Sequence, residues 1–234
     1  MLMESNGSIK SDLSTIVGPS NVFDEKFILY SYSEDASPFD GKAPGTVVRP
    51  SNTEEVVKII QYAAANNIPV VPVGGRSSIC GSTIPRVDDA LMVDFTRMNK
   101  ILAIDEGAMT VRVQIGTTWS ALIHELKEKG FKLGFRGPYG GNAGTVGGSI
   151  SGNSIGCGAS AHGGANDNVV SLEVVLANGN VIQTGSNWGM SLDEEGNAFA
   201  RYCTFNDLTG IFLGDHGSLG LKTSATLKIF PWPK

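Results

Sequence analysis

The sequence lacks any stretch of 18 or more apolar residues, so it predicts no membrane-spanning helix. It also lacks a basic run, and its formal net charge is -5. Both nucleic-acid binding and a cationic membrane-surface patch require clustered Lys and Arg, so neither is expected. The first ten residues are polar and contain no apolar segment followed by a small-residue cleavage site, so no signal peptide is expected.

Cysteine is scarce. The three cysteines, Cys80, Cys157 and Cys203, are far apart and odd in number, and none belongs to a C-x-x-C pair that would suit zinc or an iron–sulfur cluster. We therefore expect no metal within this chain and a reducing, cytoplasmic location.

Glycine, in contrast, is abundant, at 30 of 234 residues, against a usual share of about 7%. The glycines gather in three segments, 74–81, 137–164 and 214–220. Inside regular structure each glycine costs about 0.5–1 kcal/mol relative to alanine, so such clusters need a compensating role. Close backbone approach to one extended ligand supplies that role, and a dinucleotide has the right length and polarity.

Two of these segments leave alternatives open. Backbone N–H groups at Gly74 and Gly75, with the hydroxyls of Ser77 and Ser78, can form an anion-binding concavity, but a tight turn fits this loop equally well. The second segment has the composition of a flexible linker, yet Val146, Ile150 and Ile155 interrupt it with apolar anchors.

Strand and helix signals alternate over residues 45–99. A strand over 46–49 precedes a helix that we expect to open at Ser51, with Glu54 completing a capping box. Four apolar residues at helical spacing predict its buried face: Val56, Ile59, Ile60 and Ala63. A buried strand over 68–73 follows, and this strand–helix–strand unit implies a parallel pair with a right-handed crossover.

Residues 100–234 predict a lobe dominated by antiparallel sheet. Asn178-Gly179 is a hairpin signal, because both residues tolerate positive φ. An amphipathic helix over 119–129 is expected to turn Trp119, Leu122, Ile123 and Leu126 inward. The strands expected after residue 90 cover 91–94, 101–104, 111–115, 172–176, 181–184 and 221–230.

The predicted fold class is α+β with two lobes. A small parallel-strand α/β lobe, residues 45–99, is followed by a larger, mostly antiparallel sheet lobe with flanking helices, residues 100–234. Residues 1–44, where helix-compatible and loop segments mix, are expected to form an N-terminal extension.

Six motifs stand in a fixed order along the chain: Pro50-Ser51 with Glu55-Val56, Ile68 to Gly75, Asp94 to Asn99 with Ile101, Thr145 to Gly148 with Asn153 and Gly156, Leu172 to Leu176 before Asn178-Gly179, and Gly217 to Gly220. Together they resemble the FAD-binding domain of the vanillyl-alcohol oxidase-type flavoproteins. Within that family they are most similar to the branch of glycolate oxidase FAD subunits, D-lactate dehydrogenases and alkyl-dihydroxyacetonephosphate synthase. The resemblance spans residues 47–233.

The resemblance implies FAD as the cofactor. Residues 74–78 would wrap the pyrophosphate, 139–145 and 152–156 would line the flavin and ribityl chain, and 216–221 would lie against the ring system. The implied cofactor-binding residues are Val73, Gly74, Gly75, Arg76, Ser77, Ser78, Pro138, Tyr139, Gly144, Thr145, Gly148, Gly152, Asn153, Ile155, Gly156, His216, Gly217, Gly220 and Leu221.

The sequence departs from the family at several positions. Arg76 stands where a third glycine is usual, and it could pair with the pyrophosphate or point to solvent. Relatives that attach flavin covalently use a His and a Cys where Ser77 and Ala143 stand here, so non-covalent FAD is expected. His216 falls where Glu is common, and no catalytic residue is assigned.

The resemblance also implies a substrate-binding domain after the FAD domain, and the sequence contains no constellation suited to substrate acid–base chemistry. We expect the chain to be a subunit of a hetero-oligomer, with a substrate-domain subunit and an iron–sulfur electron-transfer subunit as partners. A fragment of a longer protein is the alternative.

Two functions are compatible with this resemblance. One is the FAD subunit of a 2-hydroxy-acid dehydrogenase of the lactate or glycolate type. The other is an electron-relay FAD subunit like that of molybdenum hydroxylases. The 79–81 stretch and the Asn178-Gly179 hairpin favour the first. A domain that has lost FAD is disfavoured, because all three glycine segments persist.

Overall fold

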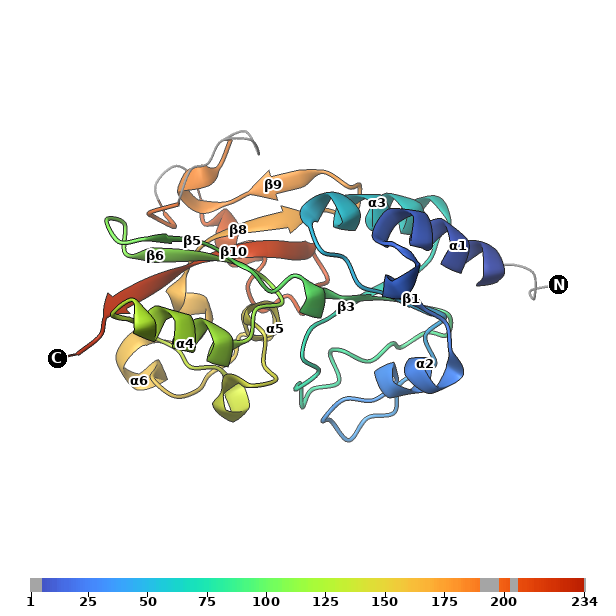
Figure 1. The fold of residues 1–234 in the computed structure, drawn as a ribbon, viewed down its shortest axis with the longest axis horizontal. Coiled ribbons are helices and arrows are strands. Elements are labelled where there is room, and N and C mark those ends of the chain that lie inside the picture. The colour runs from blue at the N-terminus through green and yellow to red at the C-terminus, as the bar shows by residue number, and fades with distance from the viewer. Residues whose placement is uncertain (1–5, 190–197, 203–205, 234) are drawn as a thin grey trace.

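The computed structural model describes residues 6–189, 198–202 and 206–233. It confirms the α+β fold, with two sheets arranged end to end along the long axis of the molecule (Figure 1). The N-terminal lobe holds a four-stranded sheet, and the second lobe holds a six-stranded sheet. The chain ends of the described part lie at opposite ends of the molecule.

The sheet of the first lobe has the order β1-β2-β4-β3. Its strands are β1 (Val22–Phe23), β2 (Thr46–Val48), β3 (Val70–Val73) and β4 (Leu91–Asp94). Strands β2 and β3 each pair in parallel with β4, so the expected direct pair between them is wrong: β4 is inserted between the two. Strand β3 is an edge strand in which only Val73 is buried, and therefore Pro72, which lacks an N–H, is tolerated.

Helix α3 (Thr53–Ala65) buries the four residues that the helical spacing predicts. Its start differs by one residue from the expectation, because Asn52 is the N-cap and accepts a hydrogen bond from the backbone N–H of Glu55. The Glu55 carboxylate in turn accepts from the backbone N–H of Ser51 at 2.7 Å. The acidic partner of the N-cap is therefore Glu55 and not Glu54, and its carboxylate reaches the residue before the cap.

Residues that precede β2 are part of the same lobe. Helix α1 (Asn6–Val17) packs against α3, and β1 pairs antiparallel with β2. Helix α2 (Lys26–Tyr32) lies on the other side of that sheet, below β1 and β3 in the view of Figure 1.

The second sheet confirms the predicted antiparallel lobe. Its main path has the order β5-β6-β10-β8-β9, and β7 pairs with the end of β10. The strands are β5 (Ile101–Asp105), β6 (Thr110–Gln114), β7 (Phe131–Leu133), β8 (Val169–Val175), β9 (Val181–Gln183) and β10 (Leu221–Pro231). The β8–β9 hairpin forms as expected, although only Gly179 of its two turn residues has a positive φ, of 83°.

Helices flank the second sheet. Helix α4 (Trp119–Glu128) fully buries Trp119, Leu122 and Leu126, while Ile123 is only half-buried. The remaining helices are α5 (Val146–Ser151), α6 (Ala159–His162) and α7 (Leu208–Ile211), with 3-10 turns η1 (Pro19–Asn21), η2 (Phe95–Arg97), η3 (Pro138–Gly141), η4 (Asn166–Asn168) and η5 (Gly185–Asn187). No helix in these described segments combines the length and apolar character needed to cross a bilayer.

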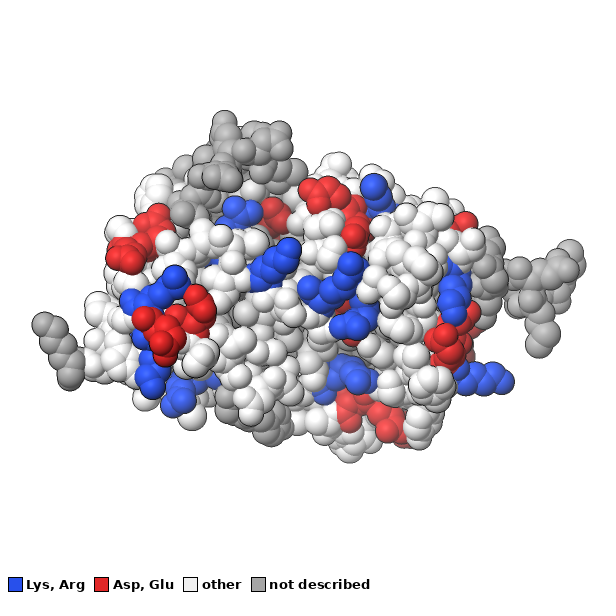
Figure 2. All heavy atoms as spheres, viewed as in Figure 1, with Lys and Arg blue, Asp and Glu red and all other residues white. Residues whose placement is uncertain are grey.

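One hydrophobic core runs through both lobes. It includes Leu13, Val56 and Ile59 of the first lobe together with Val113 and Leu172 of the second. On the surface, Lys and Arg alternate with Asp and Glu over the face shown in Figure 2, and neither sign dominates a large area there.

A part-buried hydrogen bond also joins the lobes. The Thr53 hydroxyl, at the start of α3, donates to Glu173 Oε1 on β8 at 2.7 Å. Thr223 of β10 donates to the same oxygen at 2.6 Å, and Arg112 lies 3.8 Å from the other oxygen. Because Glu173 is buried, each of these partners compensates for lost hydration of its carboxylate.

We predict that Thr53→Val lowers the free energy of unfolding by about 1–3 kcal/mol, because it removes a hydrogen bond to a buried charged acceptor. Urea denaturation followed by circular dichroism measures the change. Thr15→Val is the matched control, since the exposed Thr15 hydroxyl bonds only to its own helix. Equal stability of the two variants would contradict the prediction.

Candidate functional site

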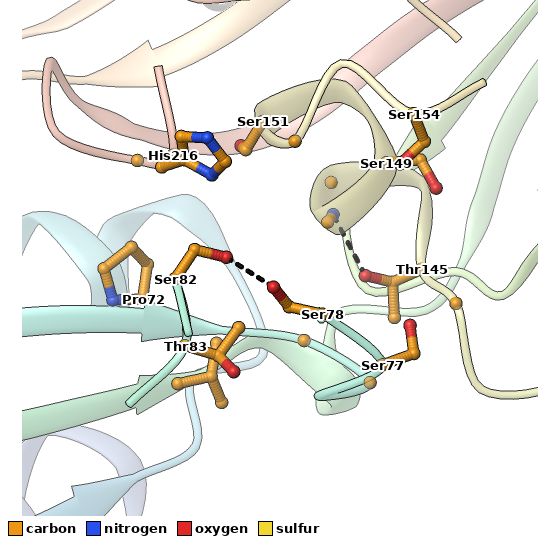
Figure 3. A pocket seen from close by; sticks show the side chains of 18 of the residues that line it. Pro72, Ser77, Ser78, Ser82, Thr83, Thr145, Ser149, Ser151, Ser154 and His216 are labelled. Atoms are coloured by element: carbon orange, nitrogen blue, oxygen red, sulfur yellow. Dashed lines mark hydrogen bonds between the residues drawn. The ribbon is translucent and has the colours of Figure 1, made fainter. Parts of the chain in front are cut away.

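A cavity of about 490 Å³ lies between the two lobes. Its three main walls are segments 72–83 of the first lobe and 144–155 and 216–222 of the second, and Phe95, Ile115 and Pro138 complete the lining. Each wall includes residues of one of the three glycine-rich segments. The tertiary structure therefore brings all three segments together, as Figure 3 shows from close by. The volume falls within the range of about 300–1,000 Å³ that is usual for small-molecule sites.

The first wall is the loop that follows β3. A Cβ atom on Gly74 would overlap the Thr145 hydroxyl, and one on Gly75 would overlap the carbonyl oxygen of Ala143. Both glycines are therefore required by the close approach of the second lobe, whatever lies in the cavity.

Arg76 lines the cavity and also contacts α2. Its guanidinium lies over the Tyr32 ring, 4.4 Å from the ring centroid, and donates to the Ser31 carbonyl oxygen. The side chain thus fastens the loop to α2. The backbone of Arg76 has a φ of 51°, a left-handed conformation that glycine adopts without strain, which is the physical reason why glycine suits this position.

Tyr32 is itself held by β4. Its hydroxyl donates to Asp94 Oδ2 at 2.5 Å. Burial raises the pKa of Tyr32 well above its usual value, and the neighbouring Asp94 charge raises it further. The phenol therefore stays protonated and keeps donating this hydrogen bond over the whole physiological range of pH.

The second wall is built around α5. Thr145 is the N-cap of this helix and accepts from the Gly148 backbone N–H at 3.2 Å. Ser149 is fixed from behind, because the buried indole N–H of Trp119 donates to its hydroxyl at 2.8 Å. Gly152, which follows α5, lines the cavity, and a Cβ there would come within 3.2 Å of the Gly148 carbonyl oxygen.

The third wall is the loop before β10. His216 has a φ of 52°, and its imidazole points into the cavity across from Ser82 and Ser78 (Figure 3). A Cβ on Gly217 would lie 2.5 Å from Pro72 Cγ, so this loop closes directly on β3. At its base, Lys222 Nζ lies 2.6 Å from Asp215 Oδ1.

The cavity suits a polar anionic ligand. Among the described residues that line it, none is Asp or Glu, whereas Arg76, His216 and Lys222 carry or can carry positive charge. Hydroxyl groups line it on several sides: Ser77, Ser78, Ser82, Thr83, Thr145, Ser149, Ser151 and Ser154. Such donors in a partly enclosed cavity favour phosphate and carbonyl oxygens over cations.

The structure brings together most of the residues that the sequence singled out. Of these residues, the ones that line the cavity are Val73, Gly74, Gly75, Arg76, Ser77, Ser78, Pro138, Gly144, Thr145, Gly148, Gly152, Asn153, Ile155, His216, Gly217, Gly220 and Leu221. Gly156 is not among the lining residues and instead faces Phe135, whose ring a Cβ would approach to 3.2 Å. Tyr139 belongs to η3, and its side chain falls outside the described residues.

Ser154 lines the cavity too, within the 152–156 segment that the resemblance implied, whereas sequence reasoning did not single out a further set of lining residues: Pro72, Ile79, Cys80, Ser82, Thr83, Phe95, Ile115, Gly147, Ser149, Ser151 and Lys222. The serines after Gly148 could have been found by extending the glycine segment to its polar neighbours. No local signal marks Phe95, Ile115 or Lys222, which reach the cavity from strands or strand ends.

The comparisons with known proteins agree on one family. A family model described as "FAD binding domain" matches residues 44–185. The chain is 35% identical over 226 residues to glycolate oxidase subunit GlcD of Bacillus subtilis, covering 97% of this chain and 45% of that protein. It is 31% identical to the mitochondrial D-lactate dehydrogenase [cytochrome] 1 of Saccharomyces cerevisiae, covering 97% and 38%.

A solved structure of alkyldihydroxyacetonephosphate synthase superposes with a TM-score of 0.82 at 26% identity, over 97% of this chain and 41% of that protein. The chain therefore spans less than half the length of each of these relatives. The three matches fall in the branch that the six motifs indicate, and they confirm that resemblance.

We predict that Gly75→Ala lowers the free energy of unfolding by at least about 2 kcal/mol, because its methyl group overlaps a backbone oxygen that cannot move aside alone. Thermal denaturation measures the loss. Gly107→Ala is the control, since that turn has room for a Cβ, with the nearest atom 3.4 Å away. A Gly75 variant as stable as the Gly107 variant would show that the lobes do not meet here.

Proposed function

Because this chain belongs to the FAD binding domain family, we propose that it is the flavin-holding part of an oxidoreductase that acts on 2-hydroxy acids. The observation that carries the proposal is the convergence of three glycine-rich segments on one cavity without acidic lining residues in the described chain. FAD, when bound, supplies the hydride-accepting group.

The cavity residues fit this cofactor. The backbone N–H groups of 74–78 and the hydroxyls of Ser77 and Ser78 would hold the pyrophosphate. Residues 144–155 would line the ribityl chain and flavin, and 216–221 would lie against the ring system. FAD is held without a covalent bond in this proposal, since Ser77 and Ala143 offer no side chain for attachment.

The substrate proposal rests on the named relatives and on the site itself. The curated relatives include a glycolate oxidase subunit and a D-lactate dehydrogenase, both named for 2-hydroxy acids. Within the cavity, no described lining residue is Asp or Glu, and His216 is the only histidine there. The groups that bind the substrate carboxylate and take its hydroxyl proton are therefore proposed to lie outside these 234 residues.

We place those groups on a substrate-binding part that covers the cavity, in a partner subunit or a further domain. Large apolar side chains are exposed on the three segments that form the cavity walls: Ile79 at 61%, Ile155 at 79% and Leu219 at 52%. Such a set is typical of a surface that another part of the protein covers. An iron–sulfur subunit that takes electrons from the flavin is a further proposed partner, since the GlcD relative is named as a subunit.

A cytoplasmic location belongs to the same proposal. Cys80 and Cys157 are both free and exposed, and exposed thiols remain reduced most readily in a reducing compartment.

The direct experiment is anaerobic mixing of the protein, purified from its own cells with its partners, with glycolate, D-lactate and other 2-hydroxy acids. We expect a yellow protein whose flavin absorbance is bleached by at least one of them. A yellow protein that no hydroxy acid bleaches would instead indicate an electron-relay role. A colourless protein that takes up no FAD would contradict FAD binding itself.

We predict that Gly152→Leu weakens FAD binding at least about tenfold, equivalent to about 1.4 kcal/mol, because Gly152 lines the cavity and a large side chain there competes with the cofactor for space. Fluorescence titration of the apoprotein with FAD measures the dissociation constant. Gly107→Leu, in the exposed β5–β6 turn, controls for the general effect of adding the side chain. Unchanged affinity in the Gly152 variant would place FAD elsewhere.

A further inference from the structure

The ion pair between Lys222 and Asp215 is the most deeply buried of those in the described part of the chain. Their side chains are 2% and 1% exposed, and the Nζ–Oδ1 distance is 2.6 Å. Removing both charges from water is unfavourable, and well-packed apolar residues in their place are often as stable or more stable. The fold alone therefore does not require a charged pair here.

The two members of the pair differ in their position relative to the cavity. Lys222, on β10, lines the cavity, whereas Asp215 does not. The carboxylate instead faces its own loop, where it accepts from the backbone N–H of Gly217 at 3.0 Å and from that of Leu219 at 3.4 Å. The negative charge is thus compensated by backbone donors of its own loop, and Lys222 is the member of the pair that adjoins the cavity.

Two opposing effects act on the pKa of Lys222. Burial lowers the pKa of Lys222 below its usual value, and the Asp215 carboxylate opposes that shift. The nearby Asp215 thus favours the ammonium form of Lys222 in a place where burial disfavours it. In such a place a charge acts on its neighbours more strongly than it would in water.

We propose that Lys222 is a fixed positive charge that favours reduced over oxidised flavin in this cavity and so raises the midpoint potential of bound FAD. The inference rests on the proposed placement of FAD between the lobes. Acceptance of a hydride adds one negative charge to the flavin, and a buried cation in the wall stabilises that added charge. Lys222 acts through its charge and transfers no proton, since its ammonium is engaged by Asp215.

A purely structural role makes a different prediction. Asp215 organises the loop that carries His216, and Ser218 donates to its carbonyl oxygen through both N–H and hydroxyl. If the pair only held this loop in place, its loss would lower stability and FAD affinity but would leave the midpoint potential unchanged.

The test is the midpoint potential of FAD bound to the whole protein, measured by slow reduction against a reference dye. The double variant Lys222→Met with Asp215→Asn removes both charges. It retains the length of the Lys222 stem and an oxygen that can accept from Gly217. We expect binding of reduced relative to oxidised flavin to weaken about tenfold, which lowers the potential by about 30 mV for a two-electron couple. Lys222→Gln alone, which keeps a donor towards Asp215, is expected to shift the potential in the same direction.

The matched control is Arg201→Met with Asp207→Asn. That pair is also 2.6 Å long and lies in the same lobe, but neither of its residues lines the cavity. We expect its potential to equal that of the wild type. If the wild type binds FAD and the Lys222 variants keep its potential, this inference is overturned and the proposed function stands. If the wild type binds no FAD, both are overturned.

Discussion

The loop after β3 lies directly against the segment before α5, and there the two lobes are in close backbone contact. The shape of the cavity depends on this contact. Gly74 and Gly75 leave no room for a side chain between this loop and Thr145 or Ala143. The continuous core and the Thr53–Glu173 hydrogen bond fix the lobes at this separation. Since the walls come from both lobes, the width of the cavity is a property of the lobe contact and not of either lobe alone.

Three non-glycine residues that line the cavity, one in each wall, have a left-handed backbone conformation: Arg76, Asn153 and His216. Such conformations are unfavourable for residues with a Cβ and persist only where surrounding contacts hold them. At Arg76 those contacts are visible, since Tyr32 and the Ser31 carbonyl hold its guanidinium and Asp94 holds Tyr32. Helix α2 thereby supports the loop proposed to bind the pyrophosphate, although it precedes that loop by more than forty residues.

Acidic and cationic side chains are placed differently with respect to the cavity. Acidic groups stand behind the walls: Asp215 pairs with Lys222, and Asp94 holds Tyr32. The described lining itself offers hydroxyls and cationic side chains. A phosphate-containing cofactor and a flavin that gains negative charge on reduction both fit this arrangement, which links the FAD proposal to the inferred role of Lys222.

The sequence by itself determined the elements and the family. Local periodicity predicts the buried face of α3, the antiparallel strands and the β8–β9 hairpin, because these signals depend on neighbours a few residues apart. The glycine segments indicated one extended ligand such as a dinucleotide, and the family resemblance of the six motifs implied FAD. Tertiary structure alone decided that β4 lies between β2 and β3, that Arg76 turns to α2 and that Lys222 reaches the cavity. Each of these depends on contacts between residues distant in sequence, for which a local pattern holds no information.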